Sequence, residues 1–401
     1  MLTTLSNNDI IKNQLYYSRY KFDLHTNFTF YLVDTVNGDE IRQREARNLY
    51  GYNGSYLHEG YIGNTKVTTE AGINARLDRT TNSELSNTVN NFTVINPFKL
   101  GDITELGAGA FINETFQFSA KFSLNAGLRF DQFYYKYNNK LASDSTLNGV
   151  GIYTANNNII SPKLNFYYQA TDKTQFYFFL GKGFHSNDTR VVVAEKGLQT
   201  LPAAYGADLG TVFKPAKNLL FNAALWYSYL QKEFVYAGDG GTVDFSGRTR
   251  RIGFDFSGRY QPVTTLYFDA DVNYAHGRSL DDPKGENYIP LAPVWSSTGG
   301  ITYIFKDGFN GSLRYRWLSD RAANEDYSLK AEGYVINDLV LNYTKKKYEI
   351  GITINNLFNV KWKETQFETE TRLKGQSAVD GIAFTPGTKF AALLHVSYFF
   401  Q

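Results

Sequence analysis

The last eight residues of the chain, LHVSYFFQ at positions 394–401, alternate in polarity along their length. The apolar and aromatic set is Leu394, Val396, Tyr398 and Phe400. Between them stand His395, Ser397 and Phe399. Because successive side chains of a β-strand point to opposite faces, the pattern predicts a strand with one apolar face. An apolar and aromatic repeat that runs to the C-terminus is typical of the closing strand of a membrane β-barrel.

The same period of two recurs along the chain. It is clearest in YKFDLHTNFTF at 20–30, KFSLNAGLRFD at 121–131, LYFDADVNY at 266–274 and YEIGITI at 348–354. No segment shows a helical apolar stripe of comparable length. The sequence therefore predicts an all-β, antiparallel fold.

Alternation alone does not say whether the apolar face meets lipid or a dry interior between two sheets, as in a soluble all-β binding protein. The expected strands are roughly ten to fifteen residues long, against about five or six in soluble sheets. A tilted membrane strand needs about 9–11 residues. We therefore expect a transmembrane β-barrel, with a lipid-facing outside and a polar inside.

Composition agrees with one barrel domain over residues 1–401. The chain has 30 Tyr and 31 Phe residues, and barrels place aromatic girdles at both membrane interfaces. The mean hydropathy of −0.37 excludes a bundle of membrane helices. A net charge of +2 gives no sign of nucleic-acid binding. With 0 Cys residues, disulfides, thiol catalysis and cysteine-ligated metals are excluded.

Turn signals alternate between short and long connections, as they do in outer-membrane barrels. Short turns are expected near 59–64, 119–120, 170–173, 214–217, 261–264, 306–308 and 345–347. Long, polar connections are expected at 81–103, 138–157, 185–200, 236–247, 278–288, 319–332 and 360–384. This spacing predicts about sixteen strands, short periplasmic turns, long extracellular loops, and both termini on the periplasmic side.

Four short motifs carry a resemblance to one family. Residues 181–190 read GKGFHSNDTR, residues 355–359 read NNLFN, residues 246–255 read SGRTRRIGFD, and the chain ends with the aromatic group at 398–400. In this order they resemble the G-x-G-F-x-S-N-D-x-R, N-L-F-N, S-x-x-x-G-x-E and terminal aromatic motifs of TonB-dependent outer-membrane receptors, with Asp255 in place of the Glu. The family-motif positions are Gly181, Gly183, Phe184, Ser186, Asn187, Asp188, Arg190, Asn355, Leu357, Phe358, Asn359 and Phe400.

The resemblance implies a barrel of about 22 strands that encloses a plug domain. We expect these 401 residues to be its C-terminal barrel portion, without a signal peptide, the plug and the first strands. The implied function is energy-coupled uptake of a large, scarce solute, such as an iron chelate, cobalamin or a glycan. The implied partners are outer-membrane lipid and lipopolysaccharide, the barrel assembly machinery, and a TonB-type energy coupler acting on the plug. A complete sixteen-stranded diffusion porin is the alternative.

Candidate binding residues lie where strands enter the outer loops: His185, Asn187, Asp188, Arg190 and His276. The five histidines have no metal-ligand spacing, and no nucleophile or acid–base constellation is present, so we expect no metal site, no cofactor and no enzyme. An outer-loop hydrolase or adhesin would require such a constellation or a repeat.

Charged residues are expected to line the lumen: Arg129, Asp131, Arg251, Asp255, Arg259, Asp269, Asp271, Arg314, Arg316 and Glu349. They fit either a solute path or a charge-paired wall that docks the plug, and polar interiors are usual in large barrels. Arg248 and Arg250 share the parity of Ile252, so they are expected to point outward at the outer strand end. There the guanidinium groups could meet lipopolysaccharide phosphates, or simply solvent.

Overall fold

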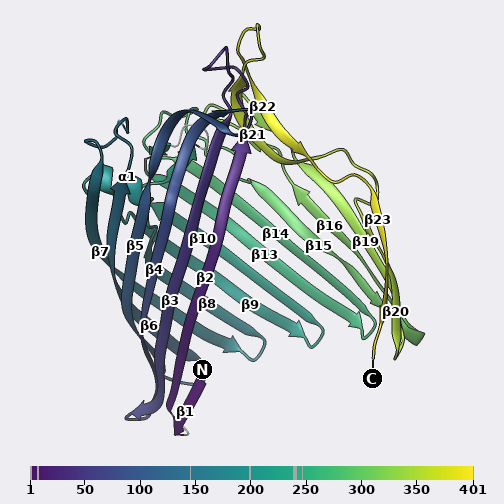
Figure 1. Ribbon diagram of the computed structural model, residues 1–401. Coiled ribbons are helices and arrows are strands. Elements are labelled where there is room, and N and C mark those ends of the chain that lie inside the picture. The colour runs from purple at the N-terminus through teal and green to yellow at the C-terminus, as the bar shows by residue number, and fades with distance from the viewer. Residues whose placement is uncertain are drawn as a thin grey trace.

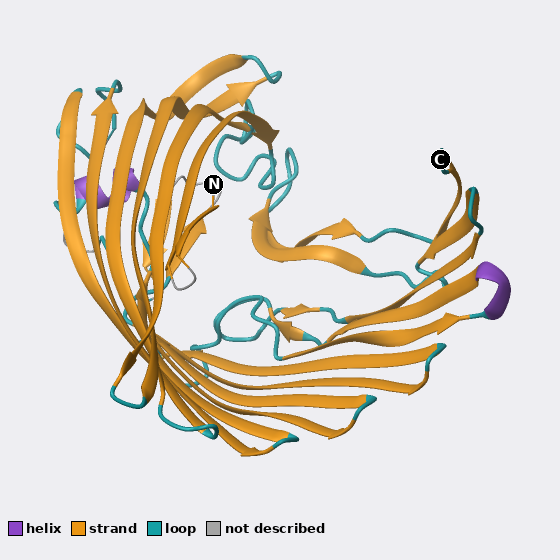
Figure 2. Ribbon diagram, turned by 90° about the horizontal axis from the view of Figure 1, so that it is seen from below, coloured by secondary structure: helices purple, strands orange, loops and turns teal. Residues whose placement is uncertain are grey.

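The computed structural model describes residues 2–6, 9–144, 146–197, 200–237, 242–245 and 247–400. One antiparallel sheet of 17 strands forms a single curved layer (Figures 1 and 2). Its first strands are β1 Leu2–Ser6, β2 Asp9–Thr26, β3 Ile41–Ile62, β4 Thr65–Val89, β5 Thr93–Gln117, β6 Phe122–Asn139, β7 Gly151–Thr171 and β8 Thr174–Phe184. The others are β9 Ala203–Ala216, β10 Leu219–Leu230, β13 Thr249–Val263, β14 Leu266–Ser279, β15 Trp295–Ile304, β16 Phe309–Leu318, β19 Tyr334–Thr344, β20 Tyr348–Asn355 and β23 Ala391–Tyr398.

The count is one strand higher than expected, because the short β1 pairs with the first residues of β2. Each strand of the sheet pairs with the next one along the chain. At the two ends of the series, β1 is paired only with β2, and β23 only with β20, within the described ranges. Figure 2 shows the resulting wall, curved but not closed. The expectation of an antiparallel barrel wall is confirmed.

The two faces of the wall differ as the alternation predicts. Leu225 and Ile350 on the outer face are 59% and 42% exposed, with no second sheet packed over them. On the inner face Arg314 forms an ion pair with Asp269, two strands away. The soluble two-layer alternative required these apolar side chains to be buried, so the structure excludes it.

Short turns gather at one end of the wall, together with both termini (Figure 1). They fall at 63–64, 118–121, 172–173, 217–218, 264–265, 305–308 and 345–347, the sixth containing the 3-10 turn η1 Lys306–Gly308. All seven expected short turns are confirmed. We call this the short-turn end, and the opposite edge the long-loop end.

The long-loop end is more ordered than its composition indicates. It carries the hairpins β11 Phe234–Ala237 with β12 Thr242–Phe245, β17 Arg321–Ala322 with β18 Lys330–Ala331, and β21 Lys363–Thr371 with β22 Val379–Pro386, and the helix α1 Thr189–Ala194. Residues 238–241 and 246, in the third motif and its loop, lie outside the described residues. No helix in the described part of the chain is long and apolar enough to span a bilayer.

The expected loop over 81–103 is wrong. β4 continues to Val89 and β5 begins at Thr93, so only a tight turn remains. Asn90 and Asn91 make that turn with φ of 53° and 63°, a conformation that Asn tolerates better than most residues. The polar residues before it form strand because they pair across the ladder, as Glu84 does with Arg42. Likewise β7 begins at Gly151, inside the expected loop 138–157.

Candidate functional site

The inner face of the wall is charge-paired. Arg259 donates to both carboxylate oxygens of Asp271 at 2.9 Å, and Arg314 binds both oxygens of Asp269. Other pairs are Arg76 with Asp78, Arg129 with Asp131, Arg251 with Glu233, Arg316 with Asp338 and His395 with Glu349. Of the ten expected lumen charges, eight pair with an opposite charge, Glu349 lies 3.5 Å from His395, and Asp255 has no such partner among the described residues. These contacts favour a charge-paired wall over a continuous solute path.

The segment 185–190 turns from the end of β8 back over the inner face of the wall. Asp188 caps α1, because its carboxylate accepts a hydrogen bond from the backbone N–H of Arg190 at 2.8 Å. The guanidinium of Arg190 also binds that carboxylate at 2.9 and 2.7 Å. Asp188 and Arg190, both predicted as binding residues, are therefore engaged with each other.

Glu105 of β5 anchors this segment to the wall. Its carboxylate accepts hydrogen bonds from Ser186 Oγ at 3.3 Å and Thr189 Oγ1 at 3.1 Å. Ser186 also lies 3.1 Å from the hydroxyl of Tyr135. Glu105 is a functional residue that the sequence analysis missed, since it is 81 residues from Ser186 and belongs to no motif.

Apolar packing fastens the same segment. Val192 and Val193 of α1 are buried against Tyr135 and Tyr137, both fully buried, and Ile103. This cluster is the largest buried apolar core in the described part of the wall, and it lies at the long-loop end. The motif segment is therefore a fixed ledge on the inner wall.

A pocket of about 440 Å³ opens below the ledge. Its lining combines the motif residues Phe184, Ser186, Asn187 and Asp188 with wall residues that include Asn74, Arg76, Asp78, Glu105, Arg129, Asp131 and Phe133. Asn187 is 5% exposed, and its Nδ2 is buried without a hydrogen-bond partner. We call this the ledge pocket. It brings together Asn187 and Asp188 of the predicted binding residues, with Arg190 beside them.

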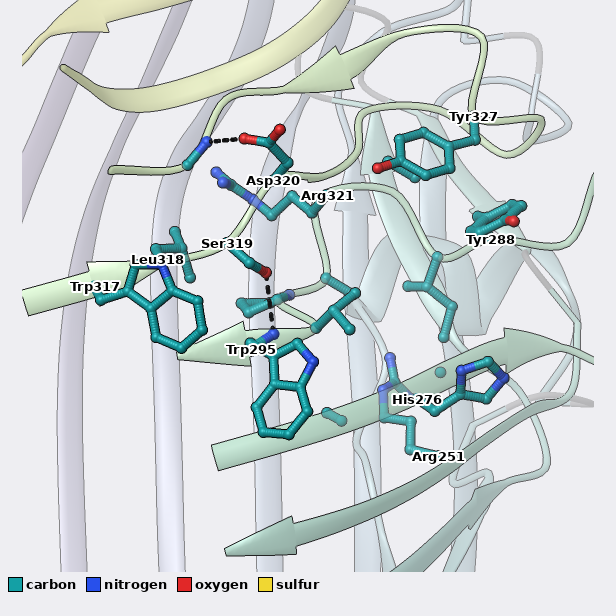
Figure 3. Close-up of a pocket in the computed structure, with 18 of the residues that line it drawn as sticks. Arg251, His276, Tyr288, Trp295, Trp317, Leu318, Ser319, Asp320, Arg321 and Tyr327 are labelled. Carbon is teal, nitrogen blue, oxygen red and sulfur yellow. Dashed lines mark hydrogen bonds between the residues drawn. The ribbon is translucent and has the colours of Figure 1, made fainter. Parts of the chain in front are cut away.

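The two predicted histidines are not brought together. His185 follows β8, whereas His276 is on β14, four strands further along the wall. At about 4.8 Å per strand this places them roughly 19 Å apart along the sheet. His276 lines a different pocket at the strand ends, shown in Figure 3. No group of three or more His, Asp or Glu side chains in the described ranges is arranged to hold a metal ion.

In the second motif the central residue is Asn356, which the prediction passed over. Asn356 is 2% exposed, with its backbone at φ 50°. Its side chain donates to the carbonyls of Val360 and Thr388 and accepts from the N–H of Val360. Asn355 is the last residue of β20, and Phe358 is 66% exposed. The backbone N–H of Leu357 donates to the carbonyl of Asn337, and the side chain of Asn359 accepts a hydrogen bond from the backbone N–H of Phe390. Asn356 therefore ties the strand end to the base of the last long loop.

The remaining motif residues show no binding geometry. A Cβ atom would fit in open space at both Gly181 and Gly183, so close packing does not require glycine there. Phe184 packs edge-on against Phe133 at 5.7 Å. Phe400 is 92% exposed beside Tyr398.

Acid should loosen the ledge only at low pH. Burial alone would raise the pKa of Asp188, but the charge and hydrogen bonds of Arg190 outweigh it and hold that pKa below the ordinary 3.8. A lowered carboxylate pKa contributes stability above about pH 4, and the contribution is lost as the pH falls through the folded-state pKa. Hydrogen exchange of the α1 amides, corrected for intrinsic rates, should show a several-fold loss of protection as the pH falls below about 4. Asp188→Asn should lower protection at pH 7 and abolish this acid step, and an unchanged acid step would contradict the assignment.

Glu105→Ala should loosen the hold of the wall on the ledge without detaching it. It removes the acceptor of two hydrogen bonds from the loop, at a cost of about 1–2 kcal/mol in local stability. Trypsin should then cut several times faster after Lys196, at the end of α1, while the packing of Val192 keeps the helix in place. Glu105→Gln, which keeps one acceptor oxygen, should lie between wild type and alanine. Equal cleavage rates in all three proteins would show that the anchor is unimportant.

The chain matches a family model described as "TonB dependent receptor-like, beta-barrel" over residues 3–357. Among solved structures it resembles the siderophore receptor PiuA from Acinetobacter baumannii, with 14% identity and a TM-score of 0.77, covering 99% of this chain and 63% of that one. It also resembles the ferric yersiniabactin uptake receptor FyuA from Yersinia pestis, with 15% identity and a TM-score of 0.75. That match covers 100% of this chain and 60% of FyuA. The copper transporter OprC has 17% identity and a TM-score of 0.74, and the match covers 98% of this chain and 63% of that one. At these identities the likeness is one of fold, and the chain spans less than two thirds of each of these proteins.

Proposed function

Because this chain belongs to the family of TonB-dependent receptor-like β-barrels, we propose that it forms wall and outer loops of an uptake receptor in the bacterial outer membrane. The observation that carries the proposal is the family match over residues 3–357, on a wall with an apolar outside and a charged inside. In this placement the long-loop end faces outward and the short turns face the periplasm. The role proposed is binding and transport, without catalysis.

A diffusion porin is not favoured. A complete sixteen-stranded porin would be a closed ring, whereas this sheet has 17 strands and its two edges do not pair within the described residues. The family match also points to energy-coupled uptake instead of free diffusion.

For the solute we propose a metal chelate. Of the three solute classes that the sequence allows, this one agrees with the names of the similar structures, which are a siderophore receptor, a ferric yersiniabactin receptor and a copper transporter. The ledge pocket supplies the amide of Asn187, whose Nδ2 has no hydrogen-bond partner in the described residues. It also supplies Arg76 and Arg129, each held by an aspartate of the wall. It lies on the inner face near the outer mouth, where a solute captured by the loops would arrive.

The proposed partners follow from this placement. Outer-membrane lipid covers the apolar face, and the barrel assembly machinery inserts the wall. An energy coupler of the TonB type would act through a plug domain enclosed by the wall, because the wall itself is a continuous hydrogen-bonded sheet.

Uptake of ⁵⁵Fe by iron-starved cells tests the proposal. Cells that produce the complete gene product should accumulate ferric chelate, and a protonophore should abolish that accumulation. Cells with the gene deleted should not accumulate it, and labelled cobalamin and oligosaccharide serve as the competing solutes. Protonophore-insensitive passage of small sugars, with no saturable uptake of any of these solutes, would favour the porin and overturn the proposal.

A further inference from the structure

A second pocket lies in the wall itself, at the long-loop end, where β14 continues to Ser279, beyond the first residue of β15. Its volume is about 720 Å³. β14 and β16 form its sides, and the connections 280–294 and 319–333 close over it, as Figure 3 shows. We call it the rim pocket. It is separate from the ledge pocket, which involves β4 to β6.

The rim pocket is cationic. Arg251, Arg278 and Arg321 line it, and Asp320 is the only carboxylate residue among its lining side chains in the described part of the chain. Asp320 is already neutralised by Lys330 at 2.6 Å and by the N–H of Gly333 at 2.8 Å. Arg251 is likewise neutralised, by Glu233. Arg278 and Arg321 remain without a carboxylate within ion-pair distance in the described residues, so the balance of charge favours an anion.

Arg321 is the most informative group in the rim pocket. It is 7% exposed, and its Nε donates to the carbonyl of Leu291 at 3.1 Å. Its Nη1 is buried without any hydrogen-bond partner. Burial lowers the pKa of this guanidinium, as expected for a cation removed from water without a counter-ion. A buried, unpaired donor of this kind is costly, and an anionic ligand would satisfy it.

The apolar side of the rim pocket belongs to the outer surface. Trp295 and Trp317 are 40% and 37% exposed and share the parity of Ile301 and Leu313, which face lipid. Val335, the register partner of Trp317, is 48% exposed. In Figure 3 the two indole rings lie below Arg321. A ligand in the rim pocket would therefore place an anionic group near Arg321 and an apolar part against Trp295 and Trp317.

A further arginine, Arg250, adds positive charge on the outward side of the rim pocket. Arg250 and Arg278 are register partners on β13 and β14, on the same outward face as His276 and its partner Ile252. Like charges directly opposite each other destabilise a sheet unless an anion lies between them. Arg278 stacks over the ring of Tyr288 at 4.0 Å, and neither arginine has a carboxylate partner in the described residues. Arg248, in contrast, is held by Asp281.

We propose that the rim pocket binds the phosphorylated head of an outer-leaflet glycolipid, with phosphate oxygens on Arg278 and Arg321 and the apolar part against Trp295 and Trp317. Planar guanidinium groups bind phosphate through paired hydrogen bonds. The inference rests on the proposed outer-membrane placement, with the long-loop end outward. It moves the lipopolysaccharide contact predicted for Arg248 and Arg250 toward Arg250, Arg278 and Arg321.

Binding of diphosphoryl lipid A to the complete gene product in detergent, followed by native mass spectrometry, tests this inference. Arg278→Ala/Arg321→Ala should weaken binding at least tenfold. Lys345→Ala/Lys347→Ala, which removes the same charge from the short-turn end, should change it less than twofold. Monophosphoryl lipid A should bind more weakly than the diphosphoryl form, and added salt should weaken both.

Arg250→Ala provides a second variant, because this exposed side chain has no partner among the described residues whose loss could disturb folding. It should weaken lipid binding about threefold while the heat-modifiable band on gels is unchanged. Unaltered lipid binding in both arginine variants would overturn the inference. So would equal competition by inorganic phosphate, which would assign the rim pocket to a soluble anion. Loss of lipid binding with normal ⁵⁵Fe uptake would separate this site from the proposed function.

Discussion

Refolded alone into detergent micelles, the 401-residue chain is expected to give no heat-modifiable band on gels. The reason lies in the two edges of the sheet. β1 covers only the first residues of β2, at Asp9 to Lys12, and the rest of β2 has a hydrogen-bonded neighbour on one side only. β23 is likewise paired on one side, with β20. Hydrocarbon cannot satisfy the free N–H and C=O groups of these edges, and each costs several kcal/mol.

A closed barrel of the same family, refolded in parallel, is the control and should show a gel shift. Hydrogen exchange adds a local measurement, since the edge-facing amides of 13–26 should be unprotected in the 401-residue chain, in contrast to the amides that pair with β3. A stable, heat-modifiable species from the chain alone, with those amides protected, would mean that the two edges find each other or those of a second copy.

Asn356→Ala is expected to destabilise the wall at the base of the last long loop by about 3 kcal/mol. The substitution removes three buried side-chain hydrogen bonds, each worth about 1 kcal/mol. Alanine also tolerates a φ of 50° less well than Asn does, so the substitution adds backbone strain. The measurement is the guanidinium midpoint of unfolding of the complete gene product, with proteolysis of the β21–β22 hairpin as a local readout.

Asn359→Ala is the matched control. Asn359 has a φ of 51° but accepts a single hydrogen bond through its side chain, from Phe390. Its loss should cost about a third as much, roughly 1 kcal/mol. Asn356→Asp should be at least as destabilising as Asn356→Ala, because a buried carboxylate oxygen would then face the carbonyls of Val360 and Thr388. If the two alanine variants were equally stable, the assignment of Asn356 as the central residue of the motif would be wrong.

The sequence predicts the wall well because its main signal is local. A period of two in 121–131 or 348–354 reports directly which residues of a strand share a face, and it does not depend on distant residues. Short turns such as 172–173 and 345–347 are equally local, since turn residues favour a fixed backbone geometry. These expectations are confirmed by the structure.

Strand length at the long-loop end could not be predicted in the same way. Residues 81–89 are polar and were expected to form a loop, yet they are strand because β3 and β5 pair with them on both sides. Polar composition indicates only that a segment leaves the lipid. Whether it continues as a ladder above the membrane depends on the neighbouring strands.

The candidate site shows the same limit. The motif at 181–190 marked the correct segment, and Asn187 and Asp188 do line a pocket. Its anchor, Glu105, follows from register and not from spacing, and the rim pocket depends on where β15 begins relative to β14. In the N-L-F-N motif the prediction named the flanking residues because they match the pattern, whereas burial and φ single out Asn356.

The uneven height of the wall has a consequence for how large objects approach the protein. β4 and β5 have 25 residues each, about 80 Å along the strand, whereas β20 has 8, about 27 Å. A bilayer core is about 30 Å thick, so β4 and β5 are long enough to continue far beyond it, whereas β20 is no longer than the core itself. Antibodies and phage tails should therefore reach the side of the wall formed by β4 and β5 first, while bulky cargo has its clearest approach over the side formed by β20.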